Sequence, residues 1–222
     1  MSKEKKQISK NLVYRVPVYL TVSRRLLKDG ARYITAPQIS AITGINVETV
    51  KKDLSQICKT PGNPKLGREA DVLVSEIIEF GVYTKLTNAV IIGAGHLGSA
   101  LLNYDGFNEW GLQIIAAIDN NPALINTTIN DKQIHGVDDL DKIIKEYTVQ
   151  IAIITVPKEY AQELVDHAVA AGVKAIWNFA PTHISVPKDV VLQNENMASS
   201  LSLLNYNLNL KISKQKRKTK RK

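Results

Sequence analysis

The feature that most constrains this 222-residue chain is a glycine-rich segment that directly follows a short apolar run. The run, residues 89–92, is typical of a strand buried in a parallel sheet, and a helix is predicted over residues 97–104. Between them, a G-x-G-x-x-G pattern allows a tight turn, a close approach of the backbone to a pyrophosphate, and close packing of helix on strand. The pattern predicts a dinucleotide site formed by Gly93, Ala94, Gly95, His96, Leu97 and Gly98.

An acidic residue at the end of the next predicted strand narrows the choice of dinucleotide. Asp119 follows the strand predicted over 112–118, about 20 residues beyond the glycines, where an acid binds the adenosine ribose hydroxyls. The same carboxylate would repel a 2′-phosphate, so the sequence favours NAD(H) over NADP(H). A glycine-rich turn that binds no ligand is the alternative at this point.

From residue 88 onward, apolar runs alternate with amphipathic segments. Further strands are predicted over 149–156, 174–178 and 190–192, and further helices over 138–147 and 159–171. Strands joined through helices imply right-handed crossovers and a parallel, doubly wound sheet. We therefore expect an α/β fold with a Rossmann domain.

Two segments that contain prolines fall at the predicted carboxyl ends of later strands, where a parallel sheet forms its ligand crevice. We expect the nicotinamide half of the cofactor to be flanked by Thr155, Val156, Pro157, Asn178 and Phe179. The alternative is that the prolines, Pro157 and Pro181, only terminate the strands. The histidines have no spacing that suggests a metal site, and no residue is assigned a catalytic role.

Three helices are predicted near the N-terminus. The first ends near Asp29-Gly30, the second runs over about 35–43, and Gly44 separates it from a third helix that Asn46 can cap. Three helices with a short glycine-containing turn before the third form the helix-turn-helix pattern. Residues 60–68 form a loop by composition, which is the wing of a winged helix, a linker, or both, and a helix over 71–83 follows.

The third helix is the candidate recognition helix, because its first residues would reach base edges of DNA. The expected DNA contacts are Arg15, Asn46, Val47, Thr49, Lys51, Lys52 and Ser55. A lysine pair on a helix can equally be a solvated face. The surrounding charge favours DNA, since residues 1–68 carry 14 Lys and Arg against four Asp and Glu. Residues 69–210 are acidic and do not suit a phosphate backbone.

The shifts in composition divide the chain into four parts. We expect a winged helix-turn-helix domain over 1–82, a Rossmann domain over 83–194, a final helix over 195–210 and a basic, disordered tail over 211–222. The final helix carries an apolar stripe that needs a packing partner, formed by Met197, Leu201, Leu204 and Leu208. The tail is either a solvated charge run or a loose binder of nucleic acid.

Several classes of protein are not expected. No apolar run approaches the length of a membrane span, and the N-terminus lacks the apolar core of a signal peptide. The single cysteine, Cys58, cannot form an internal disulfide, and we expect it to be partly buried at a helix end. These features indicate a cytoplasmic protein.

The motifs together resemble the Rex family of bacterial redox-sensing transcriptional repressors, over residues 8–206. The recognition-helix stretch over 50–55 and the dinucleotide loop over 93–101 are each similar to the family's own. The same holds for the segments 104–107, 119–122, 155–157 and 178–181.

The resemblance implies a repressor that binds double-stranded operator DNA as a homodimer and responds to the NADH/NAD+ ratio. It also implies that the final helix is exchanged between protomers as a dimerisation helix, that Tyr104 belongs to the cofactor site, and that NADH releases DNA. Asn196 and Met197 stand where the family usually has an Asp-Phe pair, so we expect a blunted response to NADH. The loop over 61–68 is longer than the family's wing, and the tail extends beyond the family's usual end.

Two other functions are alternatives: an NAD-dependent dehydrogenase with an N-terminal extension, and a redox-insensitive DNA-binding scaffold. A dehydrogenase needs a substrate domain and a general acid or base at the nicotinamide. Too few residues follow Asn178 to form that domain, and no His or Lys near Thr155 or Asn178 supplies the acid or base. We therefore expect a regulator rather than an enzyme.

Overall fold

The computed structural model describes residues 8–81 and 85–219, and the chain divides into two compact units between Lys85 and Leu86. Each unit has its own apolar core. The domain boundary expected between residues 82 and 83 lies outside the described residues.

The N-terminal unit is built from four helices: α1 (Lys10–Lys28), α2 (Ala36–Thr43), α3 (Val47–Ile57) and α4 (Ala70–Phe80). The ends of these helices follow from local chemistry. Thr35 and Gln38 form a capping box that begins α2, and Gly44 ends it in the left-handed conformation, at φ 72°. Asn46 then caps α3 by accepting a hydrogen bond from the Glu48 N–H. The predicted helix-turn-helix is confirmed.

A small antiparallel ribbon completes this unit, because β1 (Tyr33–Ile34) pairs with β2 (Arg68–Glu69). The loop over 60–67 leads from α3 to β2 and closes as a hairpin between Asn63 and Gly67. This loop is therefore the wing of a winged helix. The helix predicted over 71–83 begins at Ala70 and ends at Phe80, and position 83 lies outside the described residues.

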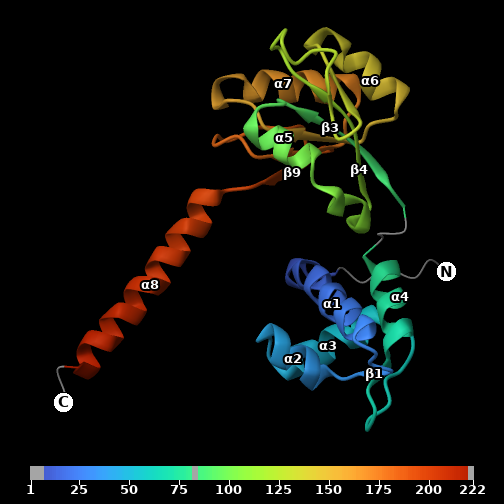
Figure 1. Ribbon diagram of the computed structural model, residues 1–222, viewed down its shortest axis with the longest axis vertical. Helices are drawn as coiled ribbons and strands as arrows, with labels where there is room; N and C mark the ends of the chain where they lie inside the picture. Colours follow the sequence, from blue (N-terminus) through green and yellow to red (C-terminus); the bar gives the residue numbers. More distant parts are fainter. Residues whose placement is uncertain (1–7, 82–84, 220–222) are drawn as a thin grey trace. The chain divides into compact units, whose positions relative to one another are not determined.

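The C-terminal unit is built on a seven-stranded sheet in the order β5-β6-β4-β3-β7-β8-β9 (Figure 1). Its strands are β3 (Thr87–Ile92), β4 (Leu112–Ile118), β5 (Thr128–Ile129), β6 (Lys132–His135), β7 (Ile151–Ile154), β8 (Ala175–Asn178) and β9 (Val191–Asn194). Every neighbouring pair is parallel except β5 with β6. The strand order reverses between β3 and β7, which is where doubly wound sheets bind their ligands.

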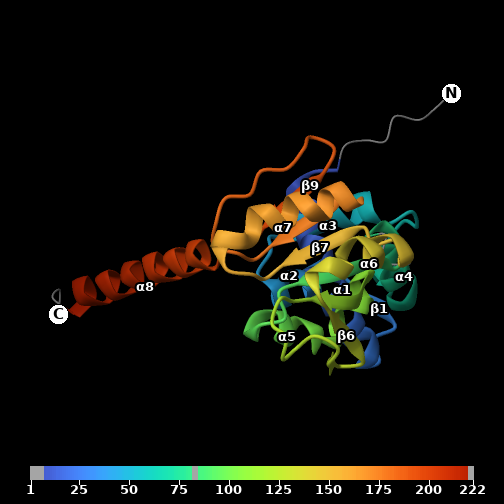
Figure 2. The same cartoon turned by 90° about the horizontal axis from the view of Figure 1, so that it is seen from above.

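Alternate residues of the strands pack against two separate layers. Val90 and Ile92 belong to the core beneath α6 (Leu140–Glu146) and α7 (Lys158–Ala171), whereas Ala89 and Ile91 face α5 (His96–Leu102). Figure 1 shows α5 on one side of the sheet and α6 and α7 on the other, and Figure 2 shows α6 and α7 side by side. The predicted doubly wound α/β fold is confirmed.

The hairpin of β5 and β6 was not predicted, because its strands are short and only partly apolar. Asn130 and Asp131 form its turn with positive φ angles of 47° and 60°, which these two residue types tolerate better than most. The 3-10 helix η1 (Asp105–Trp110) also lies outside the predicted elements, whereas η2 (Val137–Asp139) overlaps the start of the helix predicted over 138–147.

The last helix, α8 (Met197–Thr219), is longer than expected. We predicted a helix over 195–210 and a disordered tail from 211; the structure instead continues the helix through Thr219. The physical reason is that residues 209–219 contain no glycine or proline and include many lysines. Cations near the carboxyl end of a helix also interact favourably with its dipole.

Candidate NAD(H) and DNA sites

The three glycines of the dinucleotide loop have different surroundings. Gly93 has a φ of 103°, and an added Cβ would lie 2.8 Å from Val156 Cγ1. A Cβ at Gly98 would overlap the carbonyl oxygen of Gly93, so this glycine lets α5 pack against the end of β3. A Cβ at Gly95 would meet no heavy atom within 4 Å among the described residues other than its chain neighbours. The open side of the loop is therefore at Gly95, where a pyrophosphate can approach the backbone.

The remaining loop residues continue into α5. Ala94 is buried, His96 is exposed as the first residue of α5, and Leu97 is half-buried behind it. The Asp119 carboxylate ties the loop to the end of β4, because its Oδ2 accepts a 2.7 Å hydrogen bond from the Ala94 N–H. Its Oδ1 accepts from the Asn121 N–H at 2.8 Å. Asp119 is thus held beside the glycine loop, in the position of a ribose-binding acid.

A cavity of about 340 Å³ lies over these residues at the switch point of the sheet. It is lined by Ile92, Gly93, Gly95, Ile118, Asp119, Asn120, Val137, Thr155, Val156, Pro157, Tyr160, Glu163 and Leu164. Thr155 also braces the loop, since its hydroxyl donates to the Gly93 carbonyl at 2.6 Å. Residues 155–157, which we expected to flank the nicotinamide, line the same cavity as Asp119, because β7 is the direct neighbour of β3.

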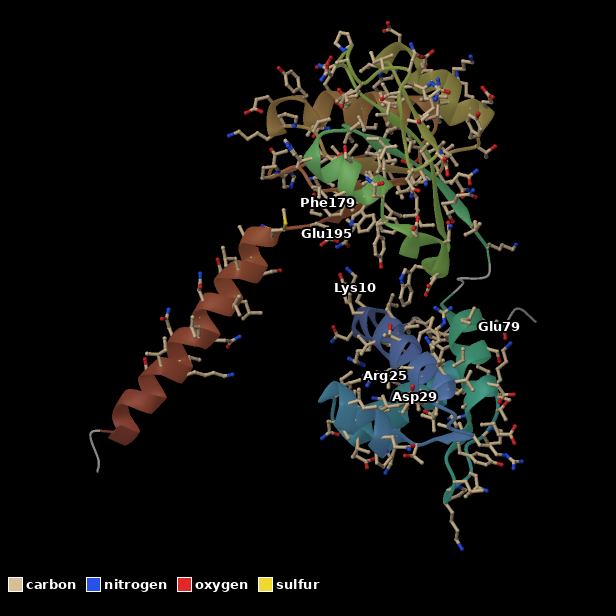
Figure 3. The ribbon with its side chains drawn as sticks, in the orientation of Figure 1. Lys10, Arg25, Asp29, Glu79, Phe179 and Glu195 are labelled. Atoms are coloured by element: carbon tan, nitrogen blue, oxygen red, sulfur yellow. The ribbon has the colours of Figure 1, made fainter. Side chains whose placement is uncertain are left out.

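Asn178 and Phe179 line a second cavity, of about 550 Å³, between the end of β8 and the start of α8. The Asn178 side chain is buried and braces its own loop, donating to Ala180 O, Thr182 O and Asn194 Oδ1 at 2.9–3.2 Å. Figure 3 labels Phe179 and Glu195 close to the point where α8 begins. Phe179 is therefore better placed than the Asn178 amide to meet a ligand.

An aromatic row joins this region to the segment after α5. The half-exposed Tyr104 ring packs edge-on against Phe107 at 4.8 Å, Phe107 against Trp177 at 5.8 Å, and Trp177 against Phe179 at 4.9 Å. The Trp177 indole N–H donates to Glu195 Oε1 at 2.9 Å. The sequence-predicted residues Tyr104 and Phe179 thus belong to one cluster, which Phe107 and Trp177 complete.

The predicted recognition helix, α3, is held against α1 by a buried carboxylate. Arg15 donates to both oxygens of Asp53, at 2.6 and 3.0 Å, and the Tyr19 hydroxyl donates to Oδ2 at 2.6 Å. Burial, together with this carboxylate, raises the pKa of Tyr19 to about 12, so the hydroxyl remains a donor at neutral pH. Arg15, which we expected to contact DNA, uses one edge of its guanidinium, Nε and Nη2, to position α3.

The other predicted DNA contacts lie along the exposed face of α3. Lys51, Lys52 and Ser55 are exposed, Val47 and Thr49 are half-buried, and the opposite face packs into the core through Val50, Leu54 and Ile57. Lys51 donates to Glu48 Oε1 at 2.8 Å on the surface. Asn46 is exposed as well, and its Oδ1 caps the helix by accepting a hydrogen bond from the Glu48 N–H.

The wing adds a cation that the sequence reasoning missed. Asn63 Oδ1 accepts hydrogen bonds from the backbone N–H groups of Lys65 at 2.8 Å and Leu66 at 3.1 Å, which closes the tip of the hairpin. Lys65 also lines a cavity of about 480 Å³ together with Lys51 and Arg68. The Asn-Pro pair before Lys65 is a turn signal that could have identified this tip from the sequence.

Cys58 lies at the end of α3 and is half-buried, as expected. Burial raises the pKa of its thiol to about 12; the nearby Arg68 opposes this shift and Glu76 adds to it. The thiol is therefore protonated at neutral pH and is a poor nucleophile. Within residues 8–81 and 85–219, no group of His, Cys, Asp and Glu side chains could hold a metal ion. No helix in this part of the chain is long and apolar enough to cross a membrane.

Comparisons with known proteins agree with this division of the chain. Residues 7–55 match a family described as putative DNA-binding protein N-terminus, and residues 84–182 match one described as CoA binding domain. The redox-sensing transcriptional repressor Rex of Bacteroides fragilis is 38% identical over 202 residues, which is 91% of each chain.

Two solved structures are similar over almost the whole chain. The structure of RSP in complex with β-NAD+ and operator DNA is 32% identical, with a TM-score of 0.85, and the match covers 96% of this chain and 98% of RSP. The structure of RSP in complex with β-NADH is also 32% identical, with a TM-score of 0.84, covering 96% and 99% of the two chains. RSP is described as a Rex-family repressor.

The winged helix and the dinucleotide-type Rossmann unit in one chain define a class, that of DNA-binding regulators with a nucleotide-binding domain. The identity to curated repressors over nine-tenths of the chain is far above what a shared fold alone requires. The chain belongs to the Rex family of redox-sensing transcriptional repressors, whose members are regulators of transcription and not enzymes.

Proposed function

We propose that this chain represses transcription by binding operator DNA as a homodimer, and that the NADH/NAD+ ratio controls the binding. The observation that carries the proposal is the glycine loop that leaves Gly95 open to a ligand while Asp119 is held beside it. A repressor whose signal contained no nucleotide would not need this arrangement. Because operator DNA is its target, we place the protein in the cytoplasm.

The cofactor that fits the C-terminal unit is NAD(H). The loop backbone and the N-terminus of α5 would hold the pyrophosphate, and Asp119 would hold the adenosine ribose. Bound dinucleotide would supply the redox-dependent charge of its nicotinamide ring. Phe179 and Tyr104 are the residues of this chain that we assign to that end, and Thr155 fixes the loop between the two ends.

The surface that fits DNA is the exposed face of α3 together with the wing. Lys51, Lys52 and Ser55 are available to phosphates or base edges, and Lys65 reaches outward from the wing. Arg15 is not included, since it is bound to Asp53. The exposed pair of Lys51 with Glu48 is worth only about 0.3–0.5 kcal/mol, so phosphate can readily displace it.

Dimerisation through α8 would explain its unusual surface. The helix carries large apolar side chains that are 39–69% exposed in one copy of the chain: Met197, Leu201, Leu203, Leu204, Tyr206, Leu208, Leu210 and Ile212. An apolar surface of this extent normally packs against a partner. A second copy of the chain is that partner, which accords with two-fold symmetric operators.

The cofactor can control DNA binding only through a difference in its affinity for the DNA-competent and released states. Asn196, at the start of α8, accepts a hydrogen bond from the Ser199 N–H at 3.0 Å, and Met197 beside it is 69% exposed. Neither side chain brings a charge or an aromatic ring to a partner's cofactor site. We therefore expect this repressor to respond to NADH only weakly.

The test is a titration of operator binding with NADH and with NAD+ separately, on the full-length protein. NADH should release the DNA at concentrations at which NAD+ does not. Equal effects of the two cofactors, with sequence-specific DNA binding retained, would instead favour a redox-insensitive DNA-binding scaffold. Binding without sequence preference would reject the repressor function itself.

A further inference from the structure

The wing is fastened at its start by a carboxylate from another helix. Glu76 on α4 reaches the segment that follows α3, where its Oε1 accepts three hydrogen bonds. The donors are the Lys59 N–H at 3.1 Å, the Thr60 N–H at 2.7 Å and the Thr60 hydroxyl at 2.7 Å. Burial alone would raise the pKa of Glu76, but the hydrogen bonds from Thr60, Cys58 and Lys59 outweigh it and lower the pKa.

The other end of the wing is fastened to the same place. Arg68, the first residue of β2, donates a hydrogen bond from its guanidinium to the Thr60 carbonyl oxygen. Gly67, the preceding residue, has a φ of 90°, and an added Cβ there would overlap the Ile34 carbonyl oxygen. The end of the wing therefore packs closely against β1. Thr60 is therefore the point at which both ends of the wing meet.

The tip of the wing is closed by its own hydrogen bonds and presents its side chains outward. The N–H groups of Asn63 and Gly67 bond to each other's carbonyl oxygens at 2.7 and 2.9 Å, and Asn63 Oδ1 takes the two N–H groups of the tip. Lys65 is exposed, and Leu66 is 50% exposed. The backbone N–H groups at the tip are hydrogen-bonded within the wing, so the side chains of Lys65 and Leu66 are the groups that the tip presents to a partner.

We propose that Glu76 is a positioning residue for DNA binding, which holds the wing in its DNA-bound shape before DNA arrives; this inference rests on the proposed function. A segment that is ordered in advance loses less conformational entropy on binding. If the start of the wing were free, ordering even one or two residues on DNA would weaken binding about tenfold. Glu76 touches no DNA itself, because its carboxylate is directed at the base of the wing.

The same helix supplies a matched control. Glu79 lies three residues further along α4 (Figure 3) and pairs with the Lys59 ammonium group, with both side chains largely exposed. Glu76→Ala and Glu79→Ala each remove one negative charge from α4 near the wing. Only Glu76→Ala removes hydrogen bonds to the wing backbone. A difference between the two variants therefore reports the fastening of the wing and not the change in net charge.

The experiment measures operator affinity of the full-length dimer at several salt concentrations, with and without a wing-tip variant. The tip variant carries Lys65→Ala and Leu66→Ala. In the unaltered background, Glu76→Ala should weaken operator binding about tenfold, and Glu79→Ala should leave it unchanged or slightly tighter. In the tip-variant background, Glu76→Ala should cost almost nothing, because the wing no longer needs to be ordered on DNA.

The salt dependence provides a second readout. The slope of log affinity against log salt should stay the same in Glu76→Ala, because no phosphate contact is lost, whereas the tip variant should lower the slope by about one. Glu76→Gln keeps an acceptor oxygen and should recover part of the affinity. Should Glu76→Ala not fold, Thr60→Val removes one donor to the same oxygen and should weaken binding in the unaltered background only.

Three results would overturn the proposal. One is an equal loss of affinity from Glu76→Ala in both backgrounds, and another is an equal loss from Glu79→Ala. The third is full affinity in Glu76→Ala and Glu76→Gln. If the unaltered protein does not bind the operator at all, the proposed function fails instead, and this outcome is distinct from the other three.

Discussion

The second and third glycines of the dinucleotide loop, Gly95 and Gly98, allow the effect of a substitution on ligand binding to be separated from its effect on fold stability. Replacement of either glycine by alanine adds the same single methyl group, but the structure places the two methyl groups in different surroundings. At Gly95 the Cβ meets no described residue within 4 Å other than its chain neighbours, and the φ of −63° is one that alanine adopts freely. At Gly98 the Cβ overlaps the Gly93 carbonyl oxygen. We therefore predict that Gly95→Ala affects the cofactor and Gly98→Ala affects the fold.

The expected magnitudes follow from these contacts. Gly95 caps α5, so alanine loses up to about 1 kcal/mol as a cap but regains about 0.4–1 kcal/mol by restricting the unfolded chain. The stability of Gly95→Ala without ligand should thus be nearly unchanged. Gly98→Ala forces the loop and α5 apart, at a cost of about 1–3 kcal/mol. NADH at one hundred times its Kd should stabilise the unaltered protein by about 2.7 kcal/mol, or about 5–10 °C in Tm.

The assay is thermal unfolding with and without NADH, combined with titration of NADH binding by fluorescence. Gly95→Ala should keep the Tm of the unaltered protein without ligand and lose most of the shift that NADH produces. Gly98→Ala should have a lowered Tm in both conditions. NADH affinity in Gly95→Ala equal to that of the unaltered protein would refute the assignment of the open side of the loop to the pyrophosphate.

Four further predictions concern the two sites and the dimer. Asp119→Ala should weaken NADH binding and narrow the discrimination against NADPH, measured by titration with both cofactors; equal affinities in the unaltered protein would contradict the ribose assignment. Lys51→Ala with Lys52→Ala should weaken operator binding at physiological salt by orders of magnitude. It should also lower the slope of log affinity against log salt by about one per lost phosphate contact. Unchanged binding would reject α3 as the recognition helix. Deletion from Asn196 onward should give monomers or aggregates in light scattering, so a well-behaved dimer would exclude α8 from the interface. Asn196→Asp with Met197→Phe should increase DNA release by NADH about tenfold. The reason is that a hydrogen bond to an ionised group is stronger than one to a neutral amide by about 1 kcal/mol or more. Strong release by NADH that the double replacement does not alter would contradict this prediction.

Local signals were sufficient for most of the fold. Thr35, Gly44 and Asn46 mark helix ends through interactions with residues two to four positions away, and the structure has α2 and α3 where these signals predicted them. The strand over 112–118 was predicted with its observed bounds, because a buried parallel strand forms an apolar run, here broken only by the exposed Gln113. Features whose chemistry is contained in a few consecutive residues can be identified from the sequence alone.

Features that depend on distant partners could not be predicted in this way. Arg15 and Asp53 are 38 residues apart, and Glu76 and Thr60 are 16 apart, so no local pattern connects them. The position of Thr155 beside the glycine loop follows from the pairing of β7 with β3, which the order of the strands along the chain does not specify. The helix α8 extends beyond its predicted end for a different reason. A lysine-rich tail carries no local signal that distinguishes a helix from a disordered segment.

The distribution of acids within the N-terminal unit bears directly on how it can bind DNA. Its net positive charge suggested a basic surface, yet a count of charges treats every Lys, Arg, Asp and Glu as equivalent. In the structure, the buried Asp53 carboxylate is neutralised by Arg15, and the Glu76 carboxylate faces the backbone of the wing. These two acids hold the DNA-binding elements in place and do not face solvent as free negative charges. The exposed Glu48 is the acid on α3 that would oppose a phosphate, and Lys51 already screens it.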